Sequence, residues 1–393
     1  MPIVQLRTTG FAKGGDAVAR EPSGRVVFVD GALAGELVEA EVVEEHRDFA
    51  RARLVRVIDA ASHRVEPPCP MVARGCGGCD LQHVAVPEQV ALKAGIVRDA
   101  LGRIAKVFDI PVEVVTLPVD GYRTTVRGVV QDGRFALRRR RSHDAVALDT
   151  CVVLHPLLDE LVQEGRFGSA SEVTLRCGAR TGERLAIVAP SVEGVSLPDD
   201  VRVVGADELR RGARAWFHEV VDGRTFRISA ESFFQARPDG AEALVSLVRT
   251  AVGELDADAR LVDAYAGVGL FAATLRGAAT AVAVERSASA VADARSNLAG
   301  TGTRIVPSAV ERFRPQRADV VVADPARSGL GRVAAARLAA TGAPRFVLVS
   351  CDPAAFARDV GLLRAEGYRL VRTTLVDLFG HTSHVELVSV FER

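Results

Sequence analysis

The chain has 393 residues, enough for two or three domains of about 150 residues each. Its 48% hydrophobic content argues against an intrinsically disordered protein, and six cysteines are too few for a secreted disulfide scaffold of this length. Lys+Arg and Asp+Glu both number 50. This zero formal charge argues against a nucleic-acid partner only if the charges are evenly spread, because a phosphate responds to local charge.

The N-terminal sequence MPIVQLRTTG lacks the cationic start and the apolar core of a signal peptide. No apolar run approaches the ~20 residues that cross a bilayer. We therefore expect a soluble cytoplasmic protein that does not bind membranes, and we expect it to be a monomer.

Residues 1–62 consist of short hydrophobic runs, such as 25–29 and 39–43, separated by turns that contain glycine. Many short strands with glycine between them are typical of a small β-barrel. The sequence therefore predicts a barrel domain over residues 1–62.

Residues 63–235 form a second predicted domain with a mixed pattern. A cysteine-rich loop over 69–80 precedes a helical stretch over about 87–107, and strands and helices alternate less regularly from about 112 onward. We expect a central α+β domain here.

Residues 236–393 show a regular alternation of short apolar strands and Ala-rich helices, which is typical of a mostly parallel, doubly wound sheet. The expected strands are 260–263, 281–284, 319–323 and 345–349.

A glycine loop follows the first of these strands. Gly267 and Gly269 come directly after the strand that contains Asp263, and Glu285 ends the next strand about 20 residues later, where an acid commonly binds ribose hydroxyls. Residues 267–272 also fit the G-x-G-x-x-A dinucleotide pattern. At this point, an oxidoreductase that uses a nicotinamide or flavin cofactor is an open alternative.

Reactive side chains follow the later strands. Asp324 and Arg327 come after one apolar strand, Cys351 after another, and the block His381–Glu386 precedes the last apolar run. Since the carboxyl ends of parallel strands share one sheet edge, a thiol, carboxylates and a cofactor loop are expected to converge there. This combination is typical of covalent catalysis.

Five motifs together resemble the RNA 5-methyluridine (uridine-C5) methyltransferase family. They are DAYAGVG at 263–269, DPARSG at 324–329, SCDP at 350–353, HTSHVE at 381–386 and Phe233-Phe234-Gln235. The resemblance covers nearly the whole chain. It implies an S-adenosylmethionine-dependent enzyme whose catalytic domain has the Rossmann-like class I methyltransferase fold, preceded by an OB-like, RNA-binding TRAM barrel.

The resemblance implies that Cys351 is the nucleophile and Glu386 the base. Uracil C5 attacks a sulfonium methyl group only weakly, but a thiolate added to C6 turns the ring into an enolate that can do so. After transfer, a carboxylate tuned upward by a partly dry site can remove the C5 proton. His384 is the alternative base, and Asp352, often asparagine in relatives, adds a negative charge that disfavours the Cys351 thiolate.

The same resemblance implies the cofactor site. The residues that match the family's cofactor-binding positions are Gln235, Tyr265, Gly267, Gly269, Glu285 and Asp324. Leu270 occupies a position that is polar in some relatives, so we predict no contact there.

Four cysteines form a candidate metal site. Cys69, Cys76 and Cys79 follow a C-x6-C-x2-C pattern, and Cys151 is the natural fourth ligand. Zinc and iron–sulfur clusters both accept four thiolates. The resemblance favours a [4Fe-4S] cluster with a structural or RNA-positioning role, since many relatives carry one at these positions. Cys177 is expected to be structural.

The densest basic tract, Arg138–Arg141, is either a solvated face or a contact with RNA phosphates. The expected partner is tRNA or 23S ribosomal RNA, and no motif decides between them. An RNA-binding protein without catalytic activity is a further alternative, but the presence of both Cys351 and Glu386 argues against it.

Overall fold

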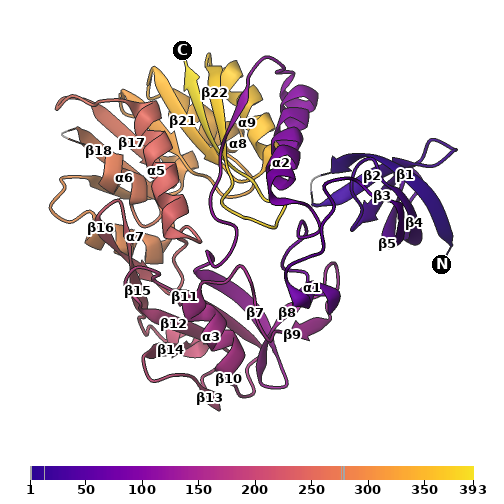
Figure 1. The fold of residues 1–393 in the computed structure, drawn as a ribbon. Helices are drawn as coiled ribbons and strands as arrows, with labels where there is room; N and C mark the ends of the chain where they lie inside the picture. The colour runs from indigo at the N-terminus through magenta and orange to yellow at the C-terminus, as the bar shows by residue number, and fades with distance from the viewer. Residues whose placement is uncertain (1, 13, 276, 278) are drawn as a thin grey trace.

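The computed structural model describes residues 2–12, 14–275, 277 and 279–393 and contains a barrel, a central sheet and a large doubly wound sheet (Figure 1). The predicted fold class is confirmed. Among the described residues, no helix has the length and apolar character needed to cross a membrane.

The barrel closes in the strand order β1-β2-β3-β5-β4. Its strands are β1 (Ile3–Ala12), β2 (Asp16–Arg20), β3 (Val26–Asp30), β4 (Leu37–Glu45) and β5 (Phe49–Asp59). Alternate side chains point inward, as Val27 and Val29 of β3 do, and both are fully buried. The turn between β2 and β3 contains Gly24 at φ +87°, a conformation that glycine adopts at no steric cost.

The central sheet has the order β14-β12-β11-β7-β8-β9. Its strands are β7 (Thr125–Gln131), β8 (Arg134–Arg138), β9 (Ala145–Ala147), β11 (Glu172–Cys177), β12 (Arg184–Ala189) and β14 (Val201–Gly205). The cysteine segment contributes the short helix α1 (Pro70–Ala73), and helix α3 (Pro156–Glu164) packs its buried Leu158 and Leu161 against this sheet. The smaller elements nearby are β10 (Arg166–Phe167), β13 (Val195–Ser196), α4 (Ala206–Arg210), β15 (Trp216–Val221) and β16 (Arg224–Ser229).

The large sheet, called the catalytic sheet below because it carries the predicted catalytic residues, has eight described strands in the order β19-β18-β17-β20-β21-β23-β22-β6. They are β17 (Arg260–Ala264), β18 (Thr280–Glu285), β19 (Arg304–Pro307), β20 (Val320–Ala323), β21 (Arg345–Ser350), β22 (Arg369–Val376), β23 (Glu386–Glu392) and β6 (Val112–Val115). Strand β23 runs antiparallel to both of its neighbours, β21 and β22.

Helices cover both faces of this sheet. One face packs against α5 (Pro238–Val252), α6 (Leu270–Leu275) and α7 (Ala288–Asn297), and the other against α2 (Val86–Ala100), α8 (Gly331–Ala339) and α9 (Pro353–Ala365). In β20, Val320 and Val322 point to the first group, while Val321 and Ala323 point to the second. The sheet is therefore buried on both sides, which explains why its strands are continuous apolar runs.

The stretch from α2 to β6 lies within the predicted central domain, 63–235, but packs with the catalytic sheet. The predicted helix 87–107 corresponds to α2 and a following π-helical turn, Leu101–Ala105. Strand β6 pairs in parallel with β22, with Val112 opposite Thr373. It satisfies the backbone groups of β22, which would otherwise form a free sheet edge.

Candidate active site

Cys351 lies in the two-residue connection between β21 and α9. Asp352 caps α9, where its Oδ1 accepts hydrogen bonds from the amides of Ala354 (3.0 Å) and Ala355 (2.9 Å). A carboxylate at this position satisfies amides that the helix itself leaves without a partner. Asp352 therefore has a local structural role beside the cysteine.

The pairing of β21 with β23 brings Cys351 and Glu386 together. Ser350 is opposite Leu387 in this antiparallel pair. The next residue along the chain, Cys351, therefore lies beside Glu386, the first residue of β23. The Glu386 side chain is buried, with a relative exposure of 4% for the whole residue.

The acidic groups around Cys351 raise the pKa of its thiol. Burial raises the pKa of the Cys351 thiol to about 12, and the charges of Glu386 and Asp324 add to the rise, while Arg327 opposes it. Burial also raises the pKa of Asp324, which directly follows β20, to about 7. The Asp352 charge raises the pKa of the Cys351 thiol further, as expected from the sequence.

Glu386 is a buried carboxyl group of the same cluster. Burial raises its pKa well above the ordinary value, the charge of Asp324 adds to this, and Arg327 opposes it. The nearby imidazole of His384 behaves in the opposite way. Burial and the Arg327 guanidinium, whose Nη2 lies 3.0 Å from His384 Nδ1, lower the pKa of His384.

The glycine loop joins β17 to α6 at the same sheet edge. Gly267 and Gly269 have φ values of +55° and +93°, a left-handed conformation that glycine adopts at no steric cost. The Glu285 carboxylate at the end of β18 accepts a hydrogen bond from the Gly267 amide (2.9 Å) and so fixes the loop. Tyr265 also has a positive φ, +60°.

Asp263 is fully buried beneath this loop. Its Oδ2 accepts a hydrogen bond from the Ala272 amide at 2.8 Å, but its Oδ1 has no hydrogen-bond partner within the described residues. Burial raises the pKa of Asp263 to about 7.

Gln235 is buried in the segment between β16 and α5. Ser232 of this segment lies 2.8 Å from Ser289 Oγ and donates a hydrogen bond to Asp293 Oδ2 (2.5 Å), and both partners belong to α7. The segment is therefore attached to the helix that follows Glu285.

The chain matches known proteins along its whole length. Residues 4–55 match the TRAM domain. The uncharacterized RNA methyltransferase of Streptomyces avermitilis is 37% identical, over 97% of this chain and 96% of its own, and that of Streptomyces coelicolor is 36% identical, over 97% and 91%. This chain belongs to the RNA methyltransferases. These relatives give no support to the oxidoreductase alternative.

The fold of the methyltransferase also matches a solved structure. The Pyrococcus abyssi tRNA (uracil-54, C5)-methyltransferase in complex with S-adenosyl-L-homocysteine has a TM-score of 0.76 and 23% sequence identity, with 99% of each chain covered. The two proteins therefore share the whole architecture, from the barrel to the catalytic sheet.

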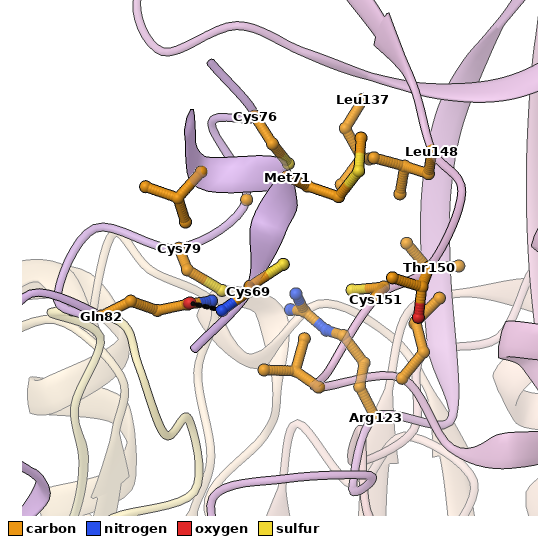
Figure 2. A pocket seen from close by; sticks show the side chains of 15 residues that line it. Cys69, Met71, Cys76, Cys79, Gln82, Arg123, Leu137, Leu148, Thr150 and Cys151 are labelled. Atoms are coloured by element: carbon orange, nitrogen blue, oxygen red, sulfur yellow. Dashed lines mark hydrogen bonds between the residues drawn. The ribbon is translucent and has the colours of Figure 1, made fainter. Parts of the chain in front are cut away.

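The four predicted cluster ligands of the methyltransferase line one pocket between α1 and the central sheet (Figure 2). Burial raises the pKa of Cys79 to about 12 and that of Cys151 to about 11, and the other thiols of the pocket add to both shifts. In the described part of the chain, no group of three or more His, Cys, Asp or Glu side chains is arranged to hold a metal ion. The predicted iron–sulfur cluster therefore finds no support in this arrangement. Cys177 lies apart from the pocket lining, in the core of the central sheet.

The arginine tract of the methyltransferase divides into two pairs. Arg138, Arg139 and Arg141 are exposed and Arg140 is half-buried, so the pairs differ in their partners rather than in their exposure. Arg140 forms ion pairs with Asp16 (3.1 Å) and Asp30 (2.8 Å) of the barrel, and Arg141 also pairs with Asp16. The second pair therefore joins the central sheet to the barrel, a role that the sequence analysis did not foresee.

The loop that precedes Glu386 is held by buried polar residues that the sequence analysis missed. Lys93 of α2 is fully buried and donates hydrogen bonds to Asp377 Oδ1 (2.5 Å) and to the Phe379 carbonyl (2.9 Å). Gln89, one helical turn earlier, accepts a hydrogen bond from the His381 amide (2.9 Å). In the sequence, the sign of this contact is a lysine and a glutamine inside a predicted helix. Their partners in the loop lie far away in the sequence.

Proposed function

We propose that this RNA methyltransferase transfers a methyl group from S-adenosylmethionine to C5 of a uridine in RNA, through a covalent adduct between Cys351 and C6. The observation that carries the proposal is the β21–β23 register, which sets a thiol beside a buried carboxyl group. Both groups are at the carboxyl edge of a sheet whose first loop is rich in glycine, where folds of this type bind nucleotide-like cofactors.

Three features of the glycine loop fit S-adenosylmethionine. Gly267 leaves open space where a side chain would lie, and the Glu285 carboxylate lies at the position typical of a ribose-binding acid. The buried Asp263 Oδ1 is an acceptor that no described residue uses. Gln235, Tyr265 and Asp324 are the further proposed contacts. When bound, S-adenosylmethionine supplies an electrophilic methyl group.

In the proposed first step, Cys351 loses its proton and its sulfur bonds to C6, which turns the uracil ring into an enolate. The raised pKa of the Cys351 thiol means that a neighbouring group has to accept the proton at neutral pH. Asp324, with a pKa of about 7, is able to exchange protons in this range. The Arg327 guanidinium favours the thiolate.

In the proposed last step, Glu386 removes the C5 proton, the C6–S bond breaks, and the C5=C6 double bond and the thiolate are restored. A carboxylate with a raised pKa is a stronger base than an ordinary one, which suits this proton transfer. His384 is less suited, because its lowered pKa makes it a weaker base and it lies beside a cation.

Release of tritium from RNA that contains 5-³H-uridine, in the presence of S-adenosylmethionine, tests the proposal. The Cys351→Ala variant should release no tritium and form no covalent RNA adduct. The Glu386→Gln variant should transfer the methyl group but accumulate the adduct on a denaturing gel. Free turnover by either variant would refute the assigned roles.

For the cysteine pocket, we propose a [4Fe-4S] cluster bound by Cys69, Cys76, Cys79 and Cys151. The proposal rests on the chemistry of the donors and not on an observed metal-binding geometry, because four thiols from two segments line one pocket. The Arg123 side chain extends into the same pocket, and its buried Nε has no hydrogen-bond partner in the described structure (Figure 2). A cation there suits a ligand set of thiolates. Iron and sulfide analysis after anaerobic purification should give iron, whereas stoichiometric zinc without iron would refute the cluster.

The substrate is proposed to be a uridine in a loop of tRNA or 23S ribosomal RNA. A target base has to leave its stack to reach Cys351, which costs a few kcal/mol and is easiest in a loop. Mapping 5-methyluridine in cellular RNA with and without this gene identifies the position and decides between the two RNA classes.

A further inference from the structure

Asp80 of the cysteine segment joins three parts of the molecule. Its carboxylate accepts two hydrogen bonds from Ser383, from the amide to Oδ1 (2.6 Å) and from the hydroxyl to Oδ2 (2.6 Å). In return, the amides of Asp80 and Leu81 donate to the His381 carbonyl, at 3.1 and 2.9 Å. Four hydrogen bonds thus connect two short segments that are far apart in the sequence.

The other side of Asp80 faces the barrel and the arginine tract. Arg140 Nη1 lies 3.7 Å from Asp80 Oδ2. The barrel backbone at Gly15 approaches so closely that a Cβ there would be 2.9 Å from the same oxygen. Asp80 also directly follows Cys79, which lines the cysteine pocket. The carboxylate is therefore confined on both sides.

The Ser383 end of this contact belongs to the catalytic loop, which we define as residues 377–385 between β22 and β23. Ser383 precedes Glu386 by three residues and His384 by one. His381 has φ +64°, a conformation that is costly for a residue other than glycine and that persists only where neighbouring contacts enforce it. The hydrogen bonds from Asp80 and Leu81 to its carbonyl are contacts of this kind.

We propose that Asp80 is a positioning residue for the catalytic base: it fixes the catalytic loop and thereby the place of the Glu386 carboxyl group relative to Cys351. The inference rests on the proposed role of Glu386. In this proposal the cysteine segment helps to position the start of β23. Any rearrangement of the loop around Cys79 would move Asp80 and, through Ser383, the start of β23.

The test compares Asp80→Ala with Asp30→Ala in single-turnover reactions of the full-length protein. Asp30 is the matched control, because it pairs with the same Arg140 but belongs to the barrel strand β3. Displacement of a base by a fraction of an ångström slows the step that it catalyses, so Asp80→Ala should resolve the covalent adduct about tenfold more slowly. Its methyl transfer should change less, and Asp30→Ala should behave as the unmodified protein. Asp80→Asn keeps an acceptor for the Ser383 amide and should recover most of the rate.

Amide hydrogen exchange of residues 381–386 provides a second measurement that does not depend on activity. Exchange should be faster in Asp80→Ala than in Asp30→Ala. If Asp80→Ala does not fold, Ser383→Ala removes one of the two hydrogen bonds from the other side and should show the same changes, but smaller.

Two results would overturn the proposal: unchanged adduct resolution and exchange in Asp80→Ala, or equal effects in Asp30→Ala, which would assign the effect to barrel docking. Failure of the proposed function itself looks different. In that case the unmodified protein forms neither adduct nor 5-methyluridine, and the exchange measurement alone decides whether Asp80 holds the loop.

Discussion

Three carboxyl groups of the proposed active site, Asp263, Asp324 and Glu386, have pKa values raised by burial. Folding moves each of them into surroundings that disfavour a negative charge. In the proposed mechanism the same groups take part in cofactor binding and proton transfer. The burial of these carboxyl groups should lower the free energy of unfolding of the protein without cofactor.

Asp263→Asn should stabilise the protein in a pH-dependent way. Below about pH 4, the usual pKa of an unfolded aspartate, Asp263 is neutral in both states and does not oppose folding. As the pH rises toward about 7, its folded-state pKa, the unfolded chain ionises first and the free energy of unfolding falls. The substituted amide stays neutral at every pH, and its carbonyl oxygen can still accept the hydrogen bond from the Ala272 amide. Thermal melts should therefore show a gain that grows from near zero at pH 4 to a few kcal/mol, at about 1.4 kcal/mol per unit of pKa shift, above pH 7.

The control is Asp258→Asn, which changes an exposed carboxylate in the turn before β17. It should leave the pH profile of the melting temperature as it is. A gain in Asp263→Asn that is equal at pH 4 and pH 8 would contradict the argument.

At the scale of elements, the apolar runs of β17, β18, β20 and β21 are predictable, because parallel strands are buried on both faces. The same pattern predicts that Gly267, Glu285, Asp324 and Cys351 lie at one edge of the sheet. The position of Glu386 beside Cys351 was implied only by family resemblance, since register depends on the antiparallel insertion of β23 between two neighbours.

The attachment of α2 and β6 to the catalytic sheet was not predictable from local patterns. Hydrophobic periodicity shows that a helix has a buried face but not which element covers it. The buried Lys93 is the clearest sign of this long-range packing, because its partners Asp377 and Phe379 lie in the catalytic loop.

Lys93→Met should destabilise the protein by about 3–5 kcal/mol, because it leaves the Asp377 carboxylate buried without its cation. The double variant Lys93→Met/Asp377→Leu removes both charges and should recover much of this loss. Denaturant unfolding of the two variants measures the difference. A double variant that is no more stable than the single one would contradict the prediction.

At the scale of the whole molecule, the net charge is zero although the chain contains a basic tract, and this tract has two roles. Arg140 and Arg141 pair with acids of the barrel, so their charge is compensated within the protein. Arg138 and Arg139 are exposed and lie outside these ion pairs with the barrel, so we expect them to be the pair that meets a phosphate. The sequence showed only four adjacent arginines, because the partners that distinguish them come from another domain.

Replacing Arg138 and Arg139 with glutamine should weaken RNA binding and reduce the slope of log affinity against log salt by about 1 for each phosphate that the variant no longer neutralises. Replacing Arg140 and Arg141 should instead loosen the barrel, which limited proteolysis between residues 60 and 69 would detect as faster cleavage. Salt titrations and proteolysis of both variants separate the two roles. An unchanged salt slope in the first variant would remove that pair from the RNA interface.

The attachment of β6 to β22 also bears on the synthesis of the protein. The ribosome makes α2 and β6 before the central sheet, but the helices that cover α2 and the strand that pairs with β6 lie beyond residue 330. The barrel and the central sheet precede these elements in the chain, whereas the apolar face of α2 stays uncovered until α8, α9 and β22 have been made. From the synthesis of α2 until that of α8, α9 and β22, the nascent chain therefore exposes an apolar helix face, a state in which chains are prone to aggregate.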